Sequence, residues 1–515
     1  MRRRRSILAL TLLALATRAA EFDPWFGEGM VLQRDQPILV RGTARPGAAV
    51  LVRLDRTAVG ANADADGRWS ARFPARPAST RPLELEAKDG IADVRLGDIL
   101  VGDVWVAAGQ SNMEFPLRRE AHAAEELPRA TLPLVRLRQH AFAGQYVGAR
   151  RLDADTVARM TPERFFEGAW SACSPASAAE MSAVGYYFAR RVAATTGVPI
   201  GLVNYAVGGA PIESFISADA LRRSPDFARK VAGDWLRNDA IEGSFVRLRA
   251  RQHLGDTPGA PKDGLGLNHG YKPGFAWAAG PSRITGFPIK GVVWYQGESN
   301  AIRAVDVEEY GALMKLLVAD WRDQWRDPAL PFLTCQLPAI AEPARLHWPR
   351  FREVQRRLEE STERYGMAVT LDLGAAKDVH PKEKREVGER LARWALFHWY
   401  GHAEICPSGP LPSSAVYDGQ TITVSFRFGQ GLACKPGVAP RLEVFCEDGA
   451  QPGEFAPIGP ARIVGDRLVV DFPADPADPK KKPALLRYAW AMDAQAALVN
   501  AAGLPATPFE LRIKR

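Results

Sequence analysis

Hydrophobic and polar positions divide the chain into a β-rich first part, a mixed middle and a β-rich last part. In residues 21–98, short runs such as "RWSARF" alternate apolar and polar side chains, and Pro-Gly or Asp-Gly pairs separate the runs. A period of two between turn residues is typical of antiparallel strands. The pattern predicts a small β-sandwich, with Asp66-Gly67 as the turn of a hairpin.

From residue 99 to 401, near-continuous apolar runs alternate with amphipathic stretches. Such runs predict strands buried on both faces, and the stretches between them predict helices. The expected strands are Asp103–Ala108, Gly201–Val207, Gly291–Gln296, Pro331–Leu337 and Met367–Leu373. The expected helices are Ala183–Thr196, Val307–Trp325, Pro349–Thr362 and a last one with Pro381 in its first turn and Gly401 as its C-cap. The alternation predicts an α/β domain with a parallel sheet.

Residues 402–515 return to the pattern of the first part. Runs such as "TITVSFRF", "RLEVFCEDG" and "RIVGDRLVVDF" lie between Asp-Gly and Gly-Asp turns. We therefore expect a C-terminal β domain after the α/β domain.

The first twenty residues have the three regions of a secretory signal. Four arginines come first, the apolar run "ILALTLLALA" follows, and "TRAA" ends the segment in small residues. The apolar run is too short to cross a bilayer. The pattern predicts a signal peptide over residues 1–20 and a periplasmic or extracellular mature protein without a membrane span.

Composition and charge agree with a globular, exported protein. Hydrophobic residues make up 46% of the chain and charged residues 24%. Without the five arginines of the first twenty residues, the formal net charge falls from +8 to +3, so charge favours no nucleic-acid partner. The five cysteines lack metal-ligand spacing. Cys434 and Cys446 could form a disulfide, although structural buried thiols are the default expectation.

Polar or glycine-rich residues follow four of the expected strands or lie a short loop beyond them. They are Gln110–Asn112, Gly208-Gly209, Gln296–Asn300 and Asp378–His380. Each of them alone could be an ordinary turn or loop. Ligands in open α/β sheets bind at the carboxyl ends of the strands, so the four together favour one site.

These residue types suit the hydrolysis of an ester. A serine hydroxyl needs a base, and Ser111 and His380 could supply the pair. The backbone N–H groups of Ser111 and Gly209 and the side-chain amide of Gln296 could stabilise an oxyanion. Met113 takes the place of the second glycine of a G-x-S-x-G motif, which disfavours a standard α/β-hydrolase.

Four stretches carry a family resemblance. "GDVWVAAGQSNMEFPL", "GLVNYAVGGAPIESF", "GVVWYQGESNA" and "DVHPKEKREVGERLA" resemble the sialate O-acetylesterase family of SGNH-type esterases. "GEGMVLQRDQPILVRGTARPG" and "RYAWAMDAQAALVNAAGLPATPF" are similar to the two ends of that family. The resemblance implies a flavodoxin-like SGNH hydrolase domain over 99–401, between β domains over 21–98 and 402–515.

The resemblance also assigns roles to residues. It implies Ser111 as the nucleophile that forms an acyl-enzyme, His380 as the base, and Gly209 and Gln296 as oxyanion or substrate-binding groups. Lys377 stands where SGNH enzymes usually have the acid of the triad, so Asp378 is the nearest candidate and Glu298 another. Gln110 and Asn112, beside the serine, are further candidates for substrate binding, and no cofactor or metal is expected.

The leading hypothesis is a secreted carbohydrate O-acetylesterase that acts on an O-acetylated glycan or sialic acid. An acetylesterase for xylan, pectin or another polysaccharide is the alternative within the enzyme class. A glycan-binding protein with a decayed site is the alternative outside it, because of the two flanking β domains and the lysine at position 377.

Overall fold

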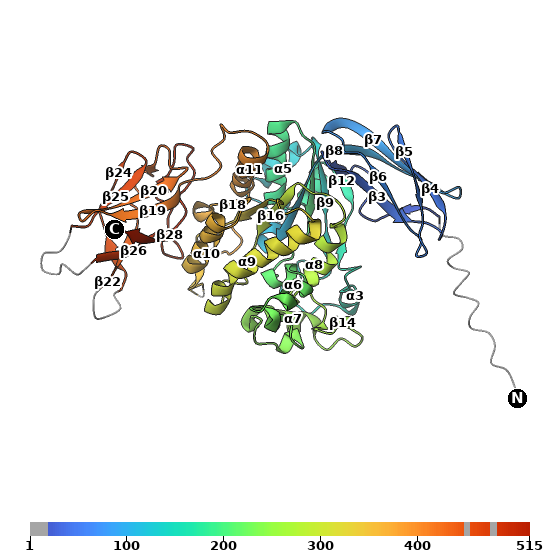
Figure 1. The fold of residues 1–515 in the computed structure, drawn as a ribbon. Helices are drawn as coiled ribbons and strands as arrows, with labels where there is room; N and C mark the ends of the chain where they lie inside the picture. The colour runs from blue at the N-terminus through green and yellow to red at the C-terminus, as the bar shows by residue number, and fades with distance from the viewer. Residues whose placement is uncertain (1–18, 344, 448–453, 474–481) are drawn as a thin grey trace.

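Three parts follow one another along the chain in the computed structural model, which describes residues 19–343, 345–447, 454–473 and 482–515 (Figure 1). A β part comes first, a central sheet with helices follows, and a second β part ends the chain. The signal peptide expected over residues 1–20 lies almost entirely outside the described residues and stays a prediction. No helix among the described residues is long and apolar enough to cross a membrane.

The first part has two small antiparallel sheets. One sheet holds β1 (Glu21–Phe22), β3 (Ile38–Thr43) and β6 (Arg68–Phe73), and the other holds β4 (Ala49–Leu54), β5 (Thr57–Asn62) and β7 (Ser79–Lys88). Alternate side chains of β3, β4 and β6 are buried. The period of two in the sequence therefore predicted the N-terminal β domain correctly.

The turn at Asp66-Gly67 is present, but the predicted hairpin is wrong. Gly67 has φ 79°, as expected of a turn glycine. The strand before it, β5, pairs with β4, and the strand after it, β6, pairs with β3. The turn leads the chain from one sheet to the other, because a turn residue sets only the local direction of the backbone. The partner of each strand depends on which sheet buries its apolar face.

A single long strand, β8 (Asp93–Gly109), joins the first part to the centre. Its first half pairs with β7, and residues Leu100–Gly102 pair with β2 (Val31–Gln33). Its last half pairs in parallel with β13 (Ile200–Asn204) and β16 (Gly291–Tyr295). The boundary expected between residues 98 and 99 thus falls inside a continuous strand and not in a linker.

The central sheet has the strand order β12-β9-β13-β8-β16-β17-β18. The strands not yet located are β9 (Leu132–Gln139), β12 (Trp170–Cys173), β17 (Phe332–Cys335) and β18 (Tyr365–Ala368). All of them run parallel to their neighbours except β12, which is antiparallel to β9. The expected parallel sheet is therefore confirmed, with an antiparallel edge strand added. The strand expected over Met367–Leu373 is corrected, because β18 ends at Ala368 and Leu371–Leu373 form a 3-10 turn.

The sequence analysis missed β9 because two of its buried side chains are arginines. Arg136 and Arg138 are both buried. Arg138 donates hydrogen bonds to the backbone oxygens of Pro24 and Trp25, in the first part of the chain. These acceptors offset the cost of burying a charged group, and they are visible only in three dimensions.

Helices cover both faces of the central sheet (Figure 1). The helices α5 (Ala183–Thr196) and α11 (Arg385–Trp399) pack together, and so do α9 (Ala304–Trp325) and α10 (Trp348–Ser361). Helix α5 has the predicted bounds, because the Ser182 hydroxyl caps its first turn by accepting the Gly185 N–H.

The start predicted for the last helix is wrong. Helix α11 begins at Arg385, four residues after Pro381. The preceding loop is held instead by Ala121, whose N–H donates to the Lys382 oxygen at 3.0 Å. Gly401, with φ 80°, follows the helix end as expected.

The last part contains a sheet of eight strands in the order β23-β22-β26-β28-β19-β20-β25-β24. The bounds are β19 Leu411–Tyr417, β20 Thr421–Arg427, β22 Leu442–Glu447, β23 Ala456–Ile458, β24 Ala461–Val464, β25 Arg467–Asp471, β26 Lys482–Tyr488 and β28 Phe509–Lys514. This confirms the C-terminal β domain. Cys434 is exposed and carries a free thiol, so the possible disulfide with Cys446 is not formed.

Candidate active site

Ser111 stands at the carboxyl end of the central strand β8. The strand ends at Gly109, which has φ 130°, and a Cβ there would come 2.1 Å from the Tyr295 oxygen of β16. Only glycine lets the two strands lie this close while the chain turns. Gln110 then caps the short helix α1 (Ser111–Glu114), so Ser111 is its first residue.

His380 and Ser111 form the central contact of the site. His380 Nε2 lies 2.8 Å from Ser111 Oγ, although 269 residues separate them in the chain. Burial lowers the pKa of His380, while the neighbouring Asp378 carboxylate opposes that shift. A neutral imidazole in contact with a serine hydroxyl can accept its proton.

Asp378 is the acid that lies beside the outer nitrogen of His380. Its Oδ1 accepts the His380 backbone N–H at 2.8 Å and lies 3.7 Å from His380 Nδ1. Glu298, the other candidate, is buried, and its Oε1 accepts a hydrogen bond from Asn112 Nδ2. The structure therefore brings Asp378, and not Glu298, to the position of a triad acid, at a distance longer than a hydrogen bond.

Gly208 and Gly209 lie against Ser111 because the chain after β13 continues alongside β8. The Val207 N–H donates to the Gly109 oxygen at 3.0 Å. A Cβ on Gly208 would come 3.8 Å from Ser111 Cβ, and a Cβ on Gly209, which has φ 78°, would come 2.2 Å from Tyr271 Oη. Neither the Ser111 nor the Gly209 N–H donates to an acceptor in the described chain. Both are available to an oxyanion, as the sequence analysis expected.

The structure does not bring the Gln296 amide to the cavity. Gln296 is fully buried, and its Nε2 donates to Gln110 Oε1 at 3.0 Å and to Asn300 Oδ1 at 2.7 Å. The expected role as an oxyanion donor is therefore corrected to a structural one. An amide nitrogen has two protons, and both are engaged inside the protein.

Asn112 is also directed away from the cavity. Its Nδ2 donates to Glu298 and to the Val379 oxygen, and its Oδ1 accepts from Lys384 Nζ at 2.6 Å. These bonds connect the serine helix to the loop that carries His380. The expected substrate-binding role of Asn112 is thus corrected to one of holding the segments of Ser111 and His380 together.

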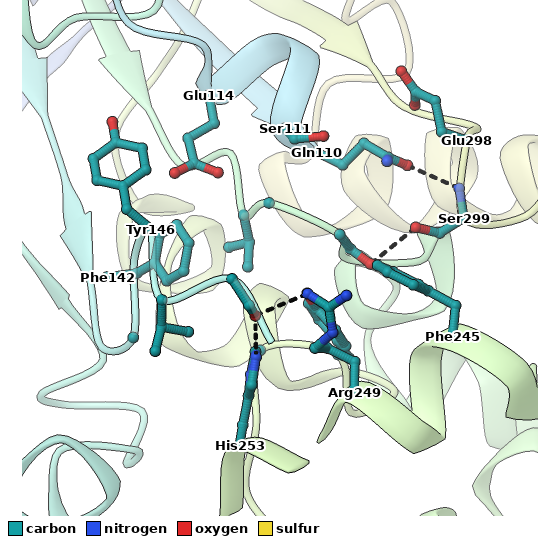
Figure 2. Close-up of a pocket in the computed structure, with 18 of the residues that line it drawn as sticks. Gln110, Ser111, Glu114, Phe142, Tyr146, Phe245, Arg249, His253, Glu298 and Ser299 are labelled. Atoms are coloured by element: carbon teal, nitrogen blue, oxygen red, sulfur yellow. Dashed lines mark hydrogen bonds between the residues drawn. The ribbon is translucent and has the colours of Figure 1, made fainter. Parts of the chain in front are cut away.

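Gln110 lines the cavity and organises a neighbouring loop. Its Oε1 accepts the N–H groups of Gly297 and Ser299 as well as the Gln296 amide. Ser299 in turn donates its hydroxyl to the Gly209 oxygen at 2.9 Å (Figure 2). The side chain of Gln110 therefore connects two of the four predicted motifs, and the Ser299 hydroxyl adds the third, Gly208-Gly209.

A cavity of about 460 Å³ opens beside Ser111 and His380. Figure 2 shows Glu114, Phe142 and Tyr146 on one side of it and Glu298, Ser299 and Phe245 on the other. Three arginines also line it, namely Arg119, Arg249 and Arg345. The volume exceeds what an acetyl group needs and suits a sugar.

The sequence analysis missed two buried charged groups at this site. Burial raises the pKa of Glu114 to about 7 and lowers the pKa of Lys384 to about 8. Lys384 lies in the charged run "PKEKRE", which looks like a solvated surface segment. The spacing of Glu114, three residues after Ser111 on a helix, was the one available signal that it shares the site.

Comparisons with known proteins agree with this geometry. The family model for carbohydrate esterases described as sialic acid-specific acetylesterase matches residues 278–396, which include Gln296, Glu298 and His380. Sialate O-acetylesterase of Homo sapiens is 26% identical over 453 residues, covering 79% of this chain and 76% of the human protein. The Rattus norvegicus sialate O-acetylesterase is 25% identical, and the alignment covers 98% of this chain and 98% of the rat protein.

A solved structure also matches nearly the whole chain. The crystal structure of a carbohydrate acetylesterase from Xanthomonas citri aligns with a TM-score of 0.75 and 30% identity. The alignment covers 96% of this chain and 99% of that protein. The two flanking β parts therefore belong to the shared architecture, together with the central sheet.

Proposed function

Because the chain belongs to the sialate O-acetylesterase family of carbohydrate esterases, we propose that it is a carbohydrate O-acetylesterase with Ser111 as its nucleophile. The observation that carries the proposal is the 2.8 Å contact between Ser111 Oγ and His380 Nε2, at the edge of a sugar-sized cavity. A decayed binding site would have no reason to keep this pair aligned.

The reaction has two halves. Ser111 Oγ attacks the acetyl carbonyl carbon while His380 Nε2 takes the hydroxyl proton, and the N–H groups of Ser111 and Gly209 stabilise the oxyanion. The intermediate expels the sugar oxygen, which receives the proton from His380. A water molecule, deprotonated by His380, then attacks the acetyl-serine, and acetate leaves as Ser111 recovers its proton.

The finer fold assignment is also part of the proposal. If β9 and β12 are set aside, the parallel strands run β13-β8-β16-β17-β18, which is the order 2-1-3-4-5 of flavodoxin-like folds. This order supports an SGNH-type hydrolase domain over residues 99–401, whose first limit divides the continuous strand β8.

Charge supports an acidic sugar as the substrate. Arg119, Arg249 and Arg345 line the cavity, while burial raises the pKa of its two buried carboxyl groups, Glu114 and Glu298. The lining is therefore positive near neutral pH and suits the carboxylate of a sialic acid. Acetate release from O-acetylated sialoglycans, compared with acetylated xylan and pectin, decides between an acidic and a neutral sugar.

The nucleophile is tested by replacing Ser111. Ser111→Ala should lower the turnover of p-nitrophenyl acetate by at least about 10³-fold, because no other group supplies the attacking oxygen. Ser299→Ala is the matched control, since Ser299 is the other serine that lines the cavity. A fluorophosphonate probe should add one mass label to the wild-type protein and to Ser299→Ala, and none to Ser111→Ala. Wild-type turnover by Ser111→Ala would refute the assignment.

Export is proposed from the N-terminal pattern of the sequence. Four arginines, an apolar run and "TRAA" support cleavage after Ala19 or Ala20. Mass analysis of the protein secreted by its native host tests this, since a mature chain that still contains Ile7–Ala16 would exclude cleavage there.

A further inference from the structure

A second cluster of titratable side chains lies outside the cavity. Glu120, His122 and Glu383 each offer a ligand atom, and these atoms lie within 4.8 Å of one another. None of the three lines the cavity. The cluster is thus separate from the esterase chemistry, and an inference about it does not depend on the proposed function.

Glu120 is the buried member of the cluster. Only 4% of the residue is exposed to solvent. Oε2 accepts the His122 N–H at 2.7 Å and the Tyr187 hydroxyl at 3.0 Å. Oε1 is buried and has no hydrogen-bond partner in the described chain. A buried carboxylate oxygen without a partner is costly, so this atom points to a ligand that would satisfy it.

The other two members lie where an ion could reach them. His122 Nε2 lies 2.8 Å from Glu383 Oε2, and the two side chains are 36% and 29% exposed. A hydrogen bond between these groups is easily exchanged for two bonds to one cation. Small rotations would bring the three atoms to about 2.0–2.2 Å from a common ion, with water completing its coordination.

We propose that Glu120, His122 and Glu383 bind one divalent transition-metal ion, Zn²⁺ or Mn²⁺. Imidazole with carboxylate is a ligand set that these ions accept, whereas Mg²⁺ and Ca²⁺ prefer oxygen ligands alone. The ion takes no part in the ester chemistry. It gives the unpaired Glu120 oxygen a partner.

The position of this site gives the ion a structural effect on the esterase. Glu120 and His122 follow the helix of Ser111, and Glu383 comes three residues after His380. The Ala121 N–H already donates to the Lys382 oxygen at 3.0 Å. An ion at this site would add a second connection between the two segments that carry the catalytic pair, and it should raise the midpoint of thermal unfolding.

The test measures Zn²⁺ and Mn²⁺ binding to the untagged full chain by isothermal titration calorimetry. Wild-type protein should bind one equivalent of one of these ions, and His122→Gln and Glu383→Gln should weaken that binding by at least about tenfold. His402→Gln is the matched control, because His402 forms a similar pair with Glu404 at 2.9 Å on the surface, and no third ligand joins that pair among the described residues. The control should bind like the wild type.

A second measurement covers the case in which a variant folds poorly. Co²⁺ bound by wild-type protein should give visible absorption bands that are lost in both site variants, while circular dichroism of the metal-free variants reports on folding. Equal binding of Zn²⁺ and Mn²⁺ by the wild type and both site variants would overturn the proposal. So would the absence of any one-equivalent binding by the wild type.

Discussion

His380 and Glu114 line the same cavity, and burial shifts the pKa of each in the direction that favours its neutral form. The pKa of His380 is lowered and that of Glu114 is raised to about 7. A neutral imidazole is what the base requires, and a neutral carboxyl group beside the oxyanion donors avoids repulsion of the developing charge. At the scale of residues, the pH dependence of the enzyme should therefore follow these two groups.

Asp378→Asn tests how much the acid contributes. The carboxylate raises the pKa of His380 against the effect of burial, so its removal should lower that pKa further. The acid limb of kcat/KM should then move to lower pH, because His380 stays neutral in more acidic solution. We expect kcat to fall only about 10- to 100-fold, less than for a buried triad acid, since Asp378 is half exposed and lies 3.7 Å from Nδ1.

The control for Asp378 is its neighbour Lys377. Lys377→Ala removes a charge from an exposed side chain next to Asp378 and should leave kcat near the wild-type value. A pH–rate profile measured on both variants separates the two residues. Wild-type kcat together with an unmoved acid limb in Asp378→Asn would show that His380 works without this acid.

Glu114→Gln should change the alkaline side of the profile. As pH rises through about 7, Glu114 ionises, and its Oε2 lies against Gly208, next to Ser111. We expect kcat/KM of the wild type to decline there and that of Glu114→Gln to stay level. An identical decline in both proteins would exclude Glu114 as its cause.

The same variant should also change stability with a definite sign. The folded-state pKa of Glu114, about 7, is above the ordinary value of 4.5, so its contribution to stability is lost as pH rises through 7. The free energy of unfolding of the wild type should therefore fall between pH 4.5 and pH 8 by about 3 kcal/mol more than that of Glu114→Gln. Denaturant unfolding at both pH values measures this difference.

At the scale of elements, the site depends on close approach between the ends of strands. Gly109 lets β8 pass β16, and Gly209 lets the chain after β13 pass Tyr271. Gln110 Oε1 accepts three hydrogen bonds from the loop after β16 and so holds it against the end of β8, and the Ser299 hydroxyl of this loop donates to the Gly209 oxygen. Ser111 and Gly209 are therefore placed by backbone packing, and hydrogen bonds of the Gln110 and Ser299 side chains maintain this packing.

Gly209→Ala should disrupt the oxyanion donor more than the fold. Its φ of 78° disfavours a side chain, and the added Cβ would come 2.2 Å from Tyr271 Oη. We expect kcat for p-nitrophenyl acetate to fall by about 10²–10³-fold, the usual loss for one oxyanion donor. Gly148→Ala is a control on a cavity loop, because its φ is also positive, at 67°, but a Cβ there meets nothing within 4 Å. Equal losses of kcat in the two variants would contradict the role of Gly209.

At the scale of the whole molecule, the three parts share structure across their borders. β8 belongs to both the N-terminal sheet and the central sheet. On the other side, Arg352 of α10 is fully buried and donates to the backbone oxygens of Ala491 and Met492. The flanking β parts should therefore unfold together with the esterase core.

Arg352→Ala tests the coupling of the C-terminal part. It removes this donor from the part-buried Ala491 oxygen and one of two donors from the Met492 oxygen, which keeps the Ile340 N–H, and it opens a space against α10. The free energy of unfolding should therefore fall by about 2 kcal/mol. Arg350→Ala, at an exposed position of the same helix, should change it by less than about 0.5 kcal/mol. Calorimetry should show one transition in the wild type. A stability of Arg352→Ala equal to that of Arg350→Ala would contradict the coupling.

Much of the fold could be predicted from periodicity and turn residues. Four of the five apolar runs lie on parallel strands, and the fifth, Met367–Leu373, overlaps β18 only at Met367 and Ala368. Helix α5 has its predicted bounds. Burial on both faces and helix capping act over a few neighbouring residues, so these elements could be predicted locally. Strand β9 was missed because the partners that allow Arg138 to be buried lie more than a hundred residues away. The hairpin predicted at Asp66-Gly67 is wrong for the same reason, since the strands on either side of the turn pair with distant strands in different sheets.

The sequence by itself determined the residue types of the site and their order. Ser111, Gly209 and His380 follow predicted strands or lie a short loop beyond one, and parallel strands place such ends together. Only the tertiary structure decided the roles of the amides and the acids. Gln296 and Asn112 face inward, Glu114 and Lys384 are buried, and Asp378 lies beside His380. Side-chain direction and burial depend on contacts between distant segments, and those contacts exist only once the chain has folded.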